Sequence, residues 1–233
     1  MKRSIQNIEK KPRSRGRPRA FDREAALDRA MELFWERGFE GTSLDSLTEA
    51  MGISTSSLYA TFGDKERLFQ AAIERYSAGP GAYHPRILRE EPTARAAMAR
   101  LFSTLAQELT RTDQPLGCMV SLAVVQASPA ASPVRQALAA YRTGARQRMV
   151  EKLREGIASG ELPEATDAES LAQFFWGVIQ GMGAQARDGA SRDDLERMGR
   201  YALQAFEAAG WAGEEERAIP AAKPSIRVRA RRL

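Results

Sequence analysis

Apolar side chains recur every three or four positions along most of the chain, which predicts amphipathic helices rather than strands. The clearest example is the stretch 42–65. Its first part places three apolar residues on one helical face: Leu44, Leu47 and Met51. Gly52 then marks the end of that helix, because glycine enters a left-handed C-cap without a steric penalty. A second short helix follows over about 55–61, and the combination predicts a helix-turn-helix.

The same spacing predicts further helices on both sides of this motif. The expected ranges are 22–37, 65–77, 92–109, 117–125, 132–159, 168–186 and 191–210. The stretch 117–125 is apolar nearly all round and is expected to form a buried helix. In contrast, the stretch 78–91 contains Gly79, Pro80, Gly81 and Pro85, which predict a break between domains. Because no segment alternates apolar and polar residues over a useful length, we expect an all-α fold of about nine helices.

These boundaries predict two folded domains between polar ends. We expect a helix-turn-helix domain over residues 20–66, a connecting helix over 67–78 and a larger helical domain over 92–210. The ends, residues 1–19 and 211–233, carry few apolar side chains and are expected to be disordered.

Positive charge is concentrated at the two ends of the chain. Residues 1–19 hold eight Lys or Arg and one acid, a net charge of +7, and residues 217–233 hold six Lys or Arg and no acid. Residues 20–79 hold six basic and eleven acidic side chains, a net charge of −5. The predicted helix-turn-helix is therefore a poor polyanion binder by bulk charge, so phosphate attraction must come from a few placed donors and from the basic arm.

Two groups of residues are the candidates for direct DNA contact. In a helix-turn-helix the second helix enters the major groove with its N-terminal residues on base edges, which selects Thr55, Ser56 and Ser57. Short hydroxyls read bases weakly, so part of the specificity is expected to come from DNA shape. Thr42 or Ser43, at a helix N-terminus, can offer a phosphate a backbone N–H and a hydroxyl.

The end of the basic arm, Arg15-Gly16-Arg17-Pro18-Arg19, resembles the core of an AT-hook. Glycine and proline keep the backbone thin between the arginines, which suits a narrow A·T-rich minor groove. The alternative is a solvated tail that touches phosphates without sequence preference.

Other classes of function lack the residues they need. There is no apolar run near 18 residues and no apolar segment behind the basic N-terminus, so we expect neither a membrane span nor a secretory signal. A single cysteine, Cys118, excludes an internal disulfide and fits a cytoplasmic protein. The single histidine, His84, has no neighbouring Cys or His cluster, and no phosphate-binding loop is present. We therefore expect no metal, no cofactor and no enzyme activity.

Residues 16–76, including ALDRAMELFWERGFEGTSLDSLTEAMGISTSSLYATFGDKERLF, resemble the DNA-binding domain of the TetR/AcrR family of transcriptional regulators. The matching motifs are the Gly38–Ser43 element, the Gly-Ile-Ser turn, the Leu58–Phe62 segment and the Asp-Lys-Glu start of the following helix. The resemblance implies a three-helix DNA-binding domain, a larger ligand-binding and dimerisation domain, and a homodimer on a palindromic operator. It also implies that a small molecule relieves repression.

The resemblance adds three phosphate-contacting candidates. Tyr59 and Thr61 stand at family positions that hydrogen-bond phosphate, although the position of Thr61 is often His, and Lys65 matches a family lysine that pairs with phosphate. It also implies that the last two long helices form a four-helix dimer interface. The candidate interface residues are Gly177, Gly181, Met182, Leu195, Met198, Tyr201 and Phe206.

A small-molecule site is expected among the helices of the second domain, where bundles form cavities. Its candidate lining is mainly apolar and aromatic, which predicts a mostly apolar effector: Phe102, Leu105, Cys118, Met119, Leu122, Tyr141, Phe175 and Trp176. Cys118 can be read as a redox or electrophile sensor or as an inert small hydrophobe. Two other readings stay open, an effector-independent architectural DNA-binding protein and an activator of the same fold.

Overall fold

The computed structural model describes residues 21–122 and 132–208, and these ranges contain helices and no strands. Nine helices have eight or more residues and two are single turns of four residues, which confirms the all-α prediction. In chain order they are α1 Arg23–Arg37, α2 Leu44–Met51, α3 Thr55–Phe62, α4 Lys65–Ala78, α5 Tyr83–Glu90, α6 Ala94–Leu109, α7 Met119–Leu122, α8 Ser132–Ala158, α9 Ala168–Arg187, α10 Arg192–Leu203 and α11 Ala205–Ala208. The expectations for the arm and the C-terminal tail lie outside these residues.

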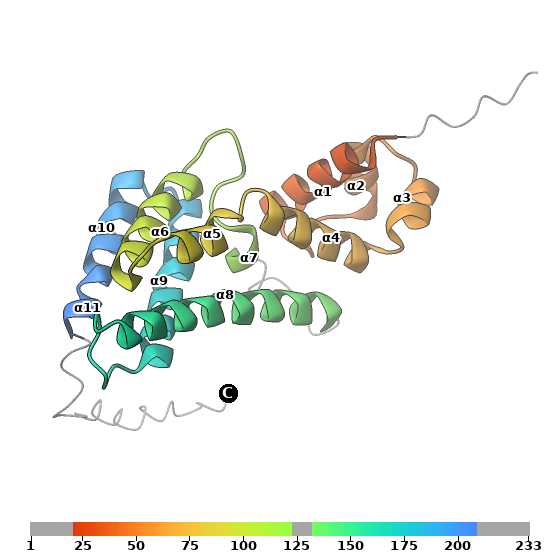
Figure 1. The fold of residues 1–233 in the computed structure, drawn as a ribbon. Helices are drawn as coiled ribbons and strands as arrows, with labels where there is room; N and C mark the ends of the chain where they lie inside the picture. The colour runs from red at the N-terminus through yellow and green to blue at the C-terminus, as the bar shows by residue number, and fades with distance from the viewer. Residues whose placement is uncertain (1–20, 123–131, 209–233) are drawn as a thin grey trace, which may run out of the picture.

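The helices form two lobes (Figure 1). Helices α1 to α4 make the first lobe, and α5, α6 and α9 to α11 make the second. The 27-residue α8 spans both, because it packs on α9 and α5 in the second lobe and reaches α4 in the first. No helix within the described ranges is long and apolar enough to cross a membrane.

The hydrophobic core of the first lobe extends beyond the segment that forms its helices. Four buried residues from later in the chain, Met119, Val120, Val134 and Leu138, join the cluster formed by α1 to α4. They come from α7 and from the first turns of α8. The second lobe therefore helps to complete the core of the first, which ties the position of α4 to the packing of α7 and α8.

Local sequence signals explain where the helices of the first lobe begin and end. The carboxylate of Asp22 accepts hydrogen bonds from the backbone N–H groups of Glu24 and Ala25 at 3.0 and 3.2 Å, and Asp64 caps α4 in the same way. Gly52 ends α2 with φ of 67°, the left-handed conformation expected of it.

The structure corrects two predicted segments. The expected break over 78–91 contains α5, because Pro85 is the third residue of that helix, where a missing N–H costs no intrahelical bond. The helix expected over 117–125 is described only as the four-residue α7, and residues 123–125 lie outside the described ranges.

Of two glycines in the second lobe, only one is required for close packing: a Cβ at Gly183 on α9 would make ordinary contacts, 3.5 Å from the Cβ of Ser121 and 3.6 Å from the Cβ of Cys118. A Cβ at Gly199 on α10 would lie 2.7 Å from the Cβ of Phe102 on α6, closer than two carbon atoms can pack. The α6–α10 contact therefore depends on glycine at position 199.

We expect Gly199→Ala to destabilise the second lobe by about 1–3 kcal/mol, because the added methyl group forces α10 away from Phe102. Urea unfolding of the two proteins measures this difference. Gly144→Ala on α8 is the matched control, since its Cβ would meet only the Arg148 side chain at 3.8 Å. The control should leave stability unchanged or raise it slightly; equal effects at both positions would contradict the packing argument.

Candidate nucleic-acid interface

The N-terminal tip of α3 presents a set of hydroxyl groups. Thr55 and Ser56 are exposed and Ser57 is half-buried. The Oγ of Ser54 lies 2.9 Å from the Oγ of Ser56 and 2.9 Å from the Oγ of Ser57, and it accepts a hydrogen bond from the Ser57 backbone N–H at 3.2 Å. Ser54 therefore caps the helix and orders the hydroxyls beside it, which leaves Thr55 and Ser56 as the groups with free access to a base edge.

Tyr59 and Thr61 lie farther along α3. The Tyr59 side chain is 48% exposed, an unusual position for a large aromatic residue, while its neighbour Leu58 is fully buried. Thr61 is half-buried. Tyr59 is thus the more accessible of the two predicted phosphate contacts.

Ser43 and Thr42 differ in accessibility at the start of α2. Ser43 is exposed and forms a capping box with Ser46. Thr42 is fully buried, and its hydroxyl donates a 2.7 Å hydrogen bond to the carbonyl of Gly38. The prediction that the Thr42 hydroxyl contacts phosphate is therefore wrong, because the turn before α2 folds this side chain inward.

Lys65 occupies the first position of α4. Its Nζ lies 4.2 Å from the centre of the Phe39 ring, a cation–π contact that fixes the ammonium group. Burial lowers the pKa of Lys65, and the nearby carboxylates of Glu40 and Glu66 oppose that shift. The predicted phosphate donor is thus held in place at a helix N-terminus, where backbone N–H groups also favour an anion.

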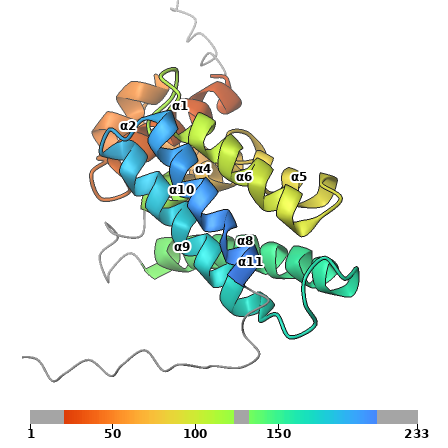
Figure 2. The same cartoon turned by 90° about the vertical axis from the view of Figure 1, so that its left-hand side faces the viewer.

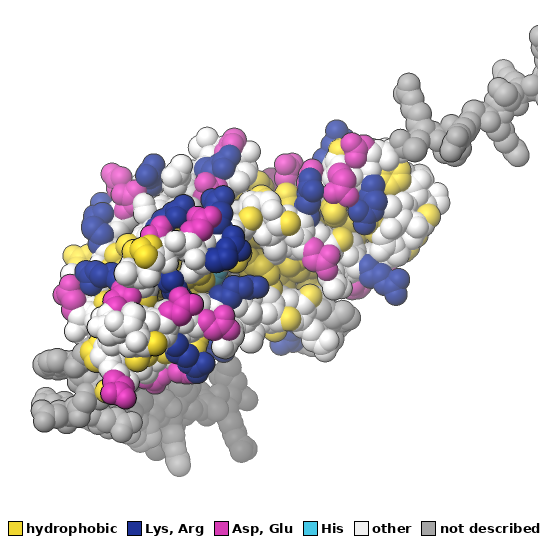
Figure 3. Space-filling model, in the orientation of Figure 1, with side chains coloured by type: hydrophobic (Ala, Val, Ile, Leu, Met, Phe, Trp, Pro, Cys, Tyr) yellow, Lys and Arg dark blue, Asp and Glu magenta, His cyan; other side chains and the backbone are white. Residues whose placement is uncertain are grey.

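A bidentate ion pair joins α4 to α1 in the first lobe. The Arg75 guanidinium on α4 donates to both carboxylate oxygens of Asp28 on α1, at 2.6 and 2.9 Å, and to Glu24 at 3.1 Å. The paired geometry defines the orientation of α4 against α1 more closely than a single contact would. On the face seen in Figure 3 this lobe carries basic and acidic side chains side by side, without a continuous basic patch.

Hydrogen bonds from three side chains connect the two lobes. The indole Nε1 of Trp35 donates to the carbonyl of Gly117 at 3.1 Å, and the hydroxyl of Tyr76 donates to the Sγ of Cys118 at 3.4 Å. Arg187, the last residue of α9, donates to the carbonyls of Trp35 and Glu36. These carbonyls belong to the last turn of α1, which lacks partners within its own helix. Helix α9 therefore caps α1 directly.

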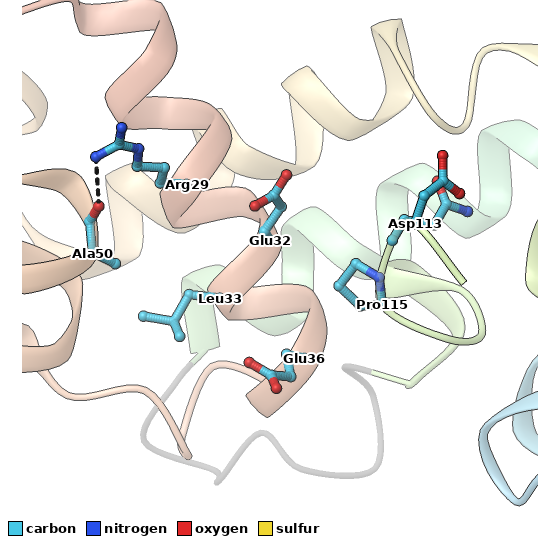
Figure 4. Close-up of a pocket in the computed structure, with 8 residues that line it drawn as sticks. Arg29, Glu32, Leu33, Glu36, Ala50, Asp113 and Pro115 are labelled. Atoms are coloured by element: carbon cyan, nitrogen blue, oxygen red, sulfur yellow. Dashed lines mark hydrogen bonds between the residues drawn. The ribbon is translucent and has the colours of Figure 1, made fainter. Parts of the chain in front are cut away.

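An open groove of about 460 Å³ lies between α1, the end of α2 and the loop after α6 (Figure 4). The Arg29 guanidinium on its wall donates to the carbonyl of Ala50 at 3.3 Å. Glu32, Glu36 and Asp113 give the remaining wall a negative charge. The groove is consequently unsuited to the DNA backbone.

The predicted effector residues do not form one lining. Phe102, Leu105, Phe175 and Trp176 are buried in the core of the second lobe, where the Phe102 and Phe175 rings pack 5.7 Å apart. Met119 belongs instead to the core of the first lobe, and Tyr141 packs against that core. Cys118 contacts both cores, and the side chain of Leu122 lies outside the described residues.

Three of the predicted dimer-interface residues are buried within the protomer. Met182, Leu195 and Phe206 belong to the core of the second lobe, so the prediction for them is wrong. Sequence alone shows that α9 and α10 are apolar, but it does not tell which apolar residues a protomer's own core takes up. The other predicted residues lie on the outer side of these helices or at its edge: Gly177, Gly181, Met198 and Tyr201.

Phe174 was missed as an interface candidate. It is 48% exposed and shares a helical face with Gly177, Val178 and Gly181, at spacings of three, four and seven residues. The spacing shows that these residues share a face but not that the face is exposed, because Phe175 and Ile179 form a second apolar face on the same helix and only the fold shows which face the core takes up.

Comparison with known proteins identifies both parts of the chain. A model described as bacterial regulatory proteins, tetR family, matches residues 26–72, and one described as Tetracyclin repressor-like, C-terminal domain, matches residues 92–202. Both describe regulators, which confirms the expectation that the chain is not an enzyme.

Individual relatives cover most of the chain. It is 38% identical over 193 residues to the HTH-type transcriptional repressor ComR of Escherichia coli K12, spanning 82% of this chain and 92% of ComR. It is 28% identical to the repressor BdcR of the same organism, over 80% of this chain and 89% of BdcR. The structure of the regulator CifR, a cysteine mutant in complex with operator DNA, matches with a TM-score of 0.78 and 43% identity, covering 82% of this chain and 100% of CifR. The chain belongs to the TetR family of transcriptional regulators.

Proposed function

We propose that this chain is a homodimeric repressor that binds a palindromic operator and leaves it when a small molecule binds the second lobe. The observation that carries the proposal is the exposed hydroxyl tip of α3 beside the exposed Tyr59, on a helix-turn-helix whose position is fixed by capping and by the Arg75 ion pair. The operator complex of CifR, and the repressor activity named for ComR and BdcR, support it.

In this proposal Thr55 and Ser56 touch base edges, while Ser57 lies beside them. Ser43, Tyr59, Thr61 and Lys65 hold the phosphates on either side. Since hydroxyl groups both donate and accept, they discriminate weakly between bases, and sequence-dependent DNA shape supplies part of the specificity. Arg15, Arg17 and Arg19 contribute from the arm.

The outer side of α9 and α10 is the proposed dimer interface (Figure 2). Phe174 and Tyr201 are 48% and 72% exposed there, and a Cβ at Gly177 would meet no atom within 4 Å. These large exposed side chains lie on the same two helices as the open space at Gly177, and a second copy of the helices could cover them. In a two-fold interface the same patch of each subunit is buried against its copy. A two-fold dimer presents two copies of α3 to two half-sites.

For an effector to release DNA, its binding in the second lobe must change the position of the first lobe. The hydrogen bonds from Trp35, Tyr76 and Arg187 attach α1 and α4 to the segment before α7 and to the end of α9. In the proposal, an effector that repacks these segments shifts α1 and α4, and with them the separation of the two α3 helices. The effector acts only through its different affinity for the two arrangements.

Selection of bound sequences from a random DNA pool with the full-length chain tests this function. The expected result is a palindrome whose half-sites are separated by one helical turn or a multiple of it. The double variant Thr55→Ala, Ser56→Ala should lower affinity for that palindrome roughly tenfold, since lost base contacts cost about 1–3 kcal/mol, and leave random DNA binding unchanged. Gln70→Ala, at an exposed position of α4, is the matched control.

The same experiment distinguishes the alternatives. Enrichment of A·T-rich DNA without a palindrome would indicate an architectural protein and would refute the proposed operator. A palindrome at which the bound protein raises transcription in a purified system would indicate an activator.

A further inference from the structure

A group of phenol and thiol side chains, of which Tyr76 is buried and the others are half-buried, gathers where the two lobes meet, and we call it the tyrosine cluster. Its members are Tyr76 on α4, Tyr83 on α5, Cys118 before α7 and Tyr141 on α8. Tyr76 donates to the Sγ of Cys118, and the hydroxyl of Tyr141 is hydrogen-bonded to Ser77. The proposed DNA contacts use none of these phenols, which three separate helices bring together.

Burial keeps these phenols in their neutral form. It raises the pKa of Tyr76 and Tyr83 well above the usual value and that of Tyr141 to about 12, and the neighbouring Cys118 adds to each shift. A neutral phenol both donates and accepts one hydrogen bond, so the cluster offers matched polar partners and no fixed charge of its own.

His84 lies beside this cluster on α5. Its side chain is 7% exposed, it meets the Trp176 ring edge-on at a centroid distance of 6.1 Å, and its Nε2 has no hydrogen-bond partner among the described residues. Burial and then the positive charge of Arg148 lower the pKa of His84 to about 4, so the ring is neutral at pH 7. The positive charge of Arg148 also lowers the pKa of Tyr141, against the larger upward effect of burial.

An unpaired, buried imidazole nitrogen destabilises the protein unless something else supplies its partner. An apolar residue would fill the space next to Trp176 without that cost. In the tautomer that carries its proton on Nδ1, the Nε2 of His84 is an acceptor and calls for an O–H or N–H donor. A nearby arginine disfavours a cation, and the ring of Trp176 favours an aromatic body. A phenol meets all three conditions, because its hydroxyl donates to nitrogen and accepts from a tyrosine.

We propose that His84 and the tyrosine cluster form the polar end of the effector site, and that the effector is a small phenol whose hydroxyl donates to Nε2 of His84. The ring of the phenol packs against Trp176, and its oxygen accepts a hydrogen bond from the cluster. This assignment rests on the proposed release of operator by a small molecule, and it replaces the predicted apolar lining with a site that binds a hydroxyl group.

The test uses 4-nitrophenol, whose phenolate absorbs visible light, whose phenol form does not, and which does not alkylate thiols. Titration of the full-length protein into the probe, at a pH where both forms are present, should abolish visible absorption in a saturable manner. His84→Phe keeps the aromatic contact with Trp176 and should weaken binding roughly tenfold or more. His84→Gln restores a hydrogen-bonding group and should recover part of the affinity. Unfolding curves and operator affinity without the probe establish that the variants are intact.

Each outcome is decisive for the site. Visible absorption that persists in the bound probe would mean that Arg148 holds the phenolate, and would overturn the proposal. Equal affinity of wild type and His84→Phe, or no saturable binding to wild type, would overturn it as well. Operator affinity with the probe present is measured separately. His84-dependent binding without operator release would leave the site in place and refute the effector-controlled release proposed above.

Discussion

Replacement of Gly177 by Arg is expected to convert the proposed dimer into folded monomers and to lower operator affinity by roughly a hundredfold. In the protomer this position is open, since an added Cβ meets no atom within 4 Å, so the fold accommodates the longer side chain. In the proposed dimer the guanidinium would be buried against the partner without a counter-charge, which strongly disfavours association. Two linked half-site contacts bind about 10²–10⁴ times more tightly than one, and the monomer loses that gain.

Analytical ultracentrifugation measures the oligomeric state and fluorescence anisotropy with labelled operator measures the affinity. Gln107→Arg is the matched control, because it adds the same charge at an exposed position of α6, on the face where Arg100 pairs with Glu90 and Glu91 rather than on α9 or α10. The control should remain dimeric and bind the operator normally. A dimer that persists with Arg at position 177, or a wild-type chain that is monomeric at micromolar concentration, would remove α9 and α10 as the interface.

The parts of the fold that follow from local chemistry were predictable. The caps at Asp22, Ser43, Ser54 and Asp64 and the glycine turn at Gly52 act within a few residues of sequence, and each is present. Helix α5 was not predicted, because proline and glycine cluster near it. Proline in the first turn of a helix carries no penalty, and Ile87 and Leu88 anchor the rest of α5 in the core.

The candidate sites show a different limit of sequence reasoning. Thr42 and Ser43 are adjacent hydroxyl residues, but only the tertiary turn at Gly38 decides that Thr42 is buried. Likewise Met182 and Phe174 are both apolar residues of α9, and their roles are separated by which face the protomer covers. Sequence reasoning named Cys118 and Tyr141 as effector residues but missed Tyr76, Tyr83 and His84, because nothing in the sequence shows that α4 and α5 bring these side chains toward the segment before α7 and toward α8. An unpaired nitrogen is a property of the folded surroundings and leaves no pattern in the chain.

Deletion of residues 1–19 is expected to lower operator affinity roughly tenfold or more at physiological salt. The arm carries a net charge of +7, whereas residues 20–79 carry −5, so the helix-turn-helix without the arm attracts DNA only through placed donors. Each phosphate contact releases counterions and contributes about −0.9 to the slope of log K against log salt concentration, so the truncated protein should also show a flatter slope. Anisotropy titrations between about 50 and 200 mM salt measure both quantities.

A triple variant separates the two ways in which the arm can act. Changing Arg15, Arg17 and Arg19 to Lys keeps the charge, so an arm that only touches phosphates should retain its affinity and salt slope. If the arm inserts into an A·T-rich minor groove, the Lys variant should lose affinity, and only for operators with A·T-rich flanks. A guanidinium group is more weakly hydrated than an ammonium group, so arginine enters the narrow groove more readily than lysine. If deletion changes neither the affinity nor the slope, the arm contributes no attraction. The attraction must then come from the basic residues 217–233 or from placed donors of the helix-turn-helix such as Ser43, Tyr59 and Lys65.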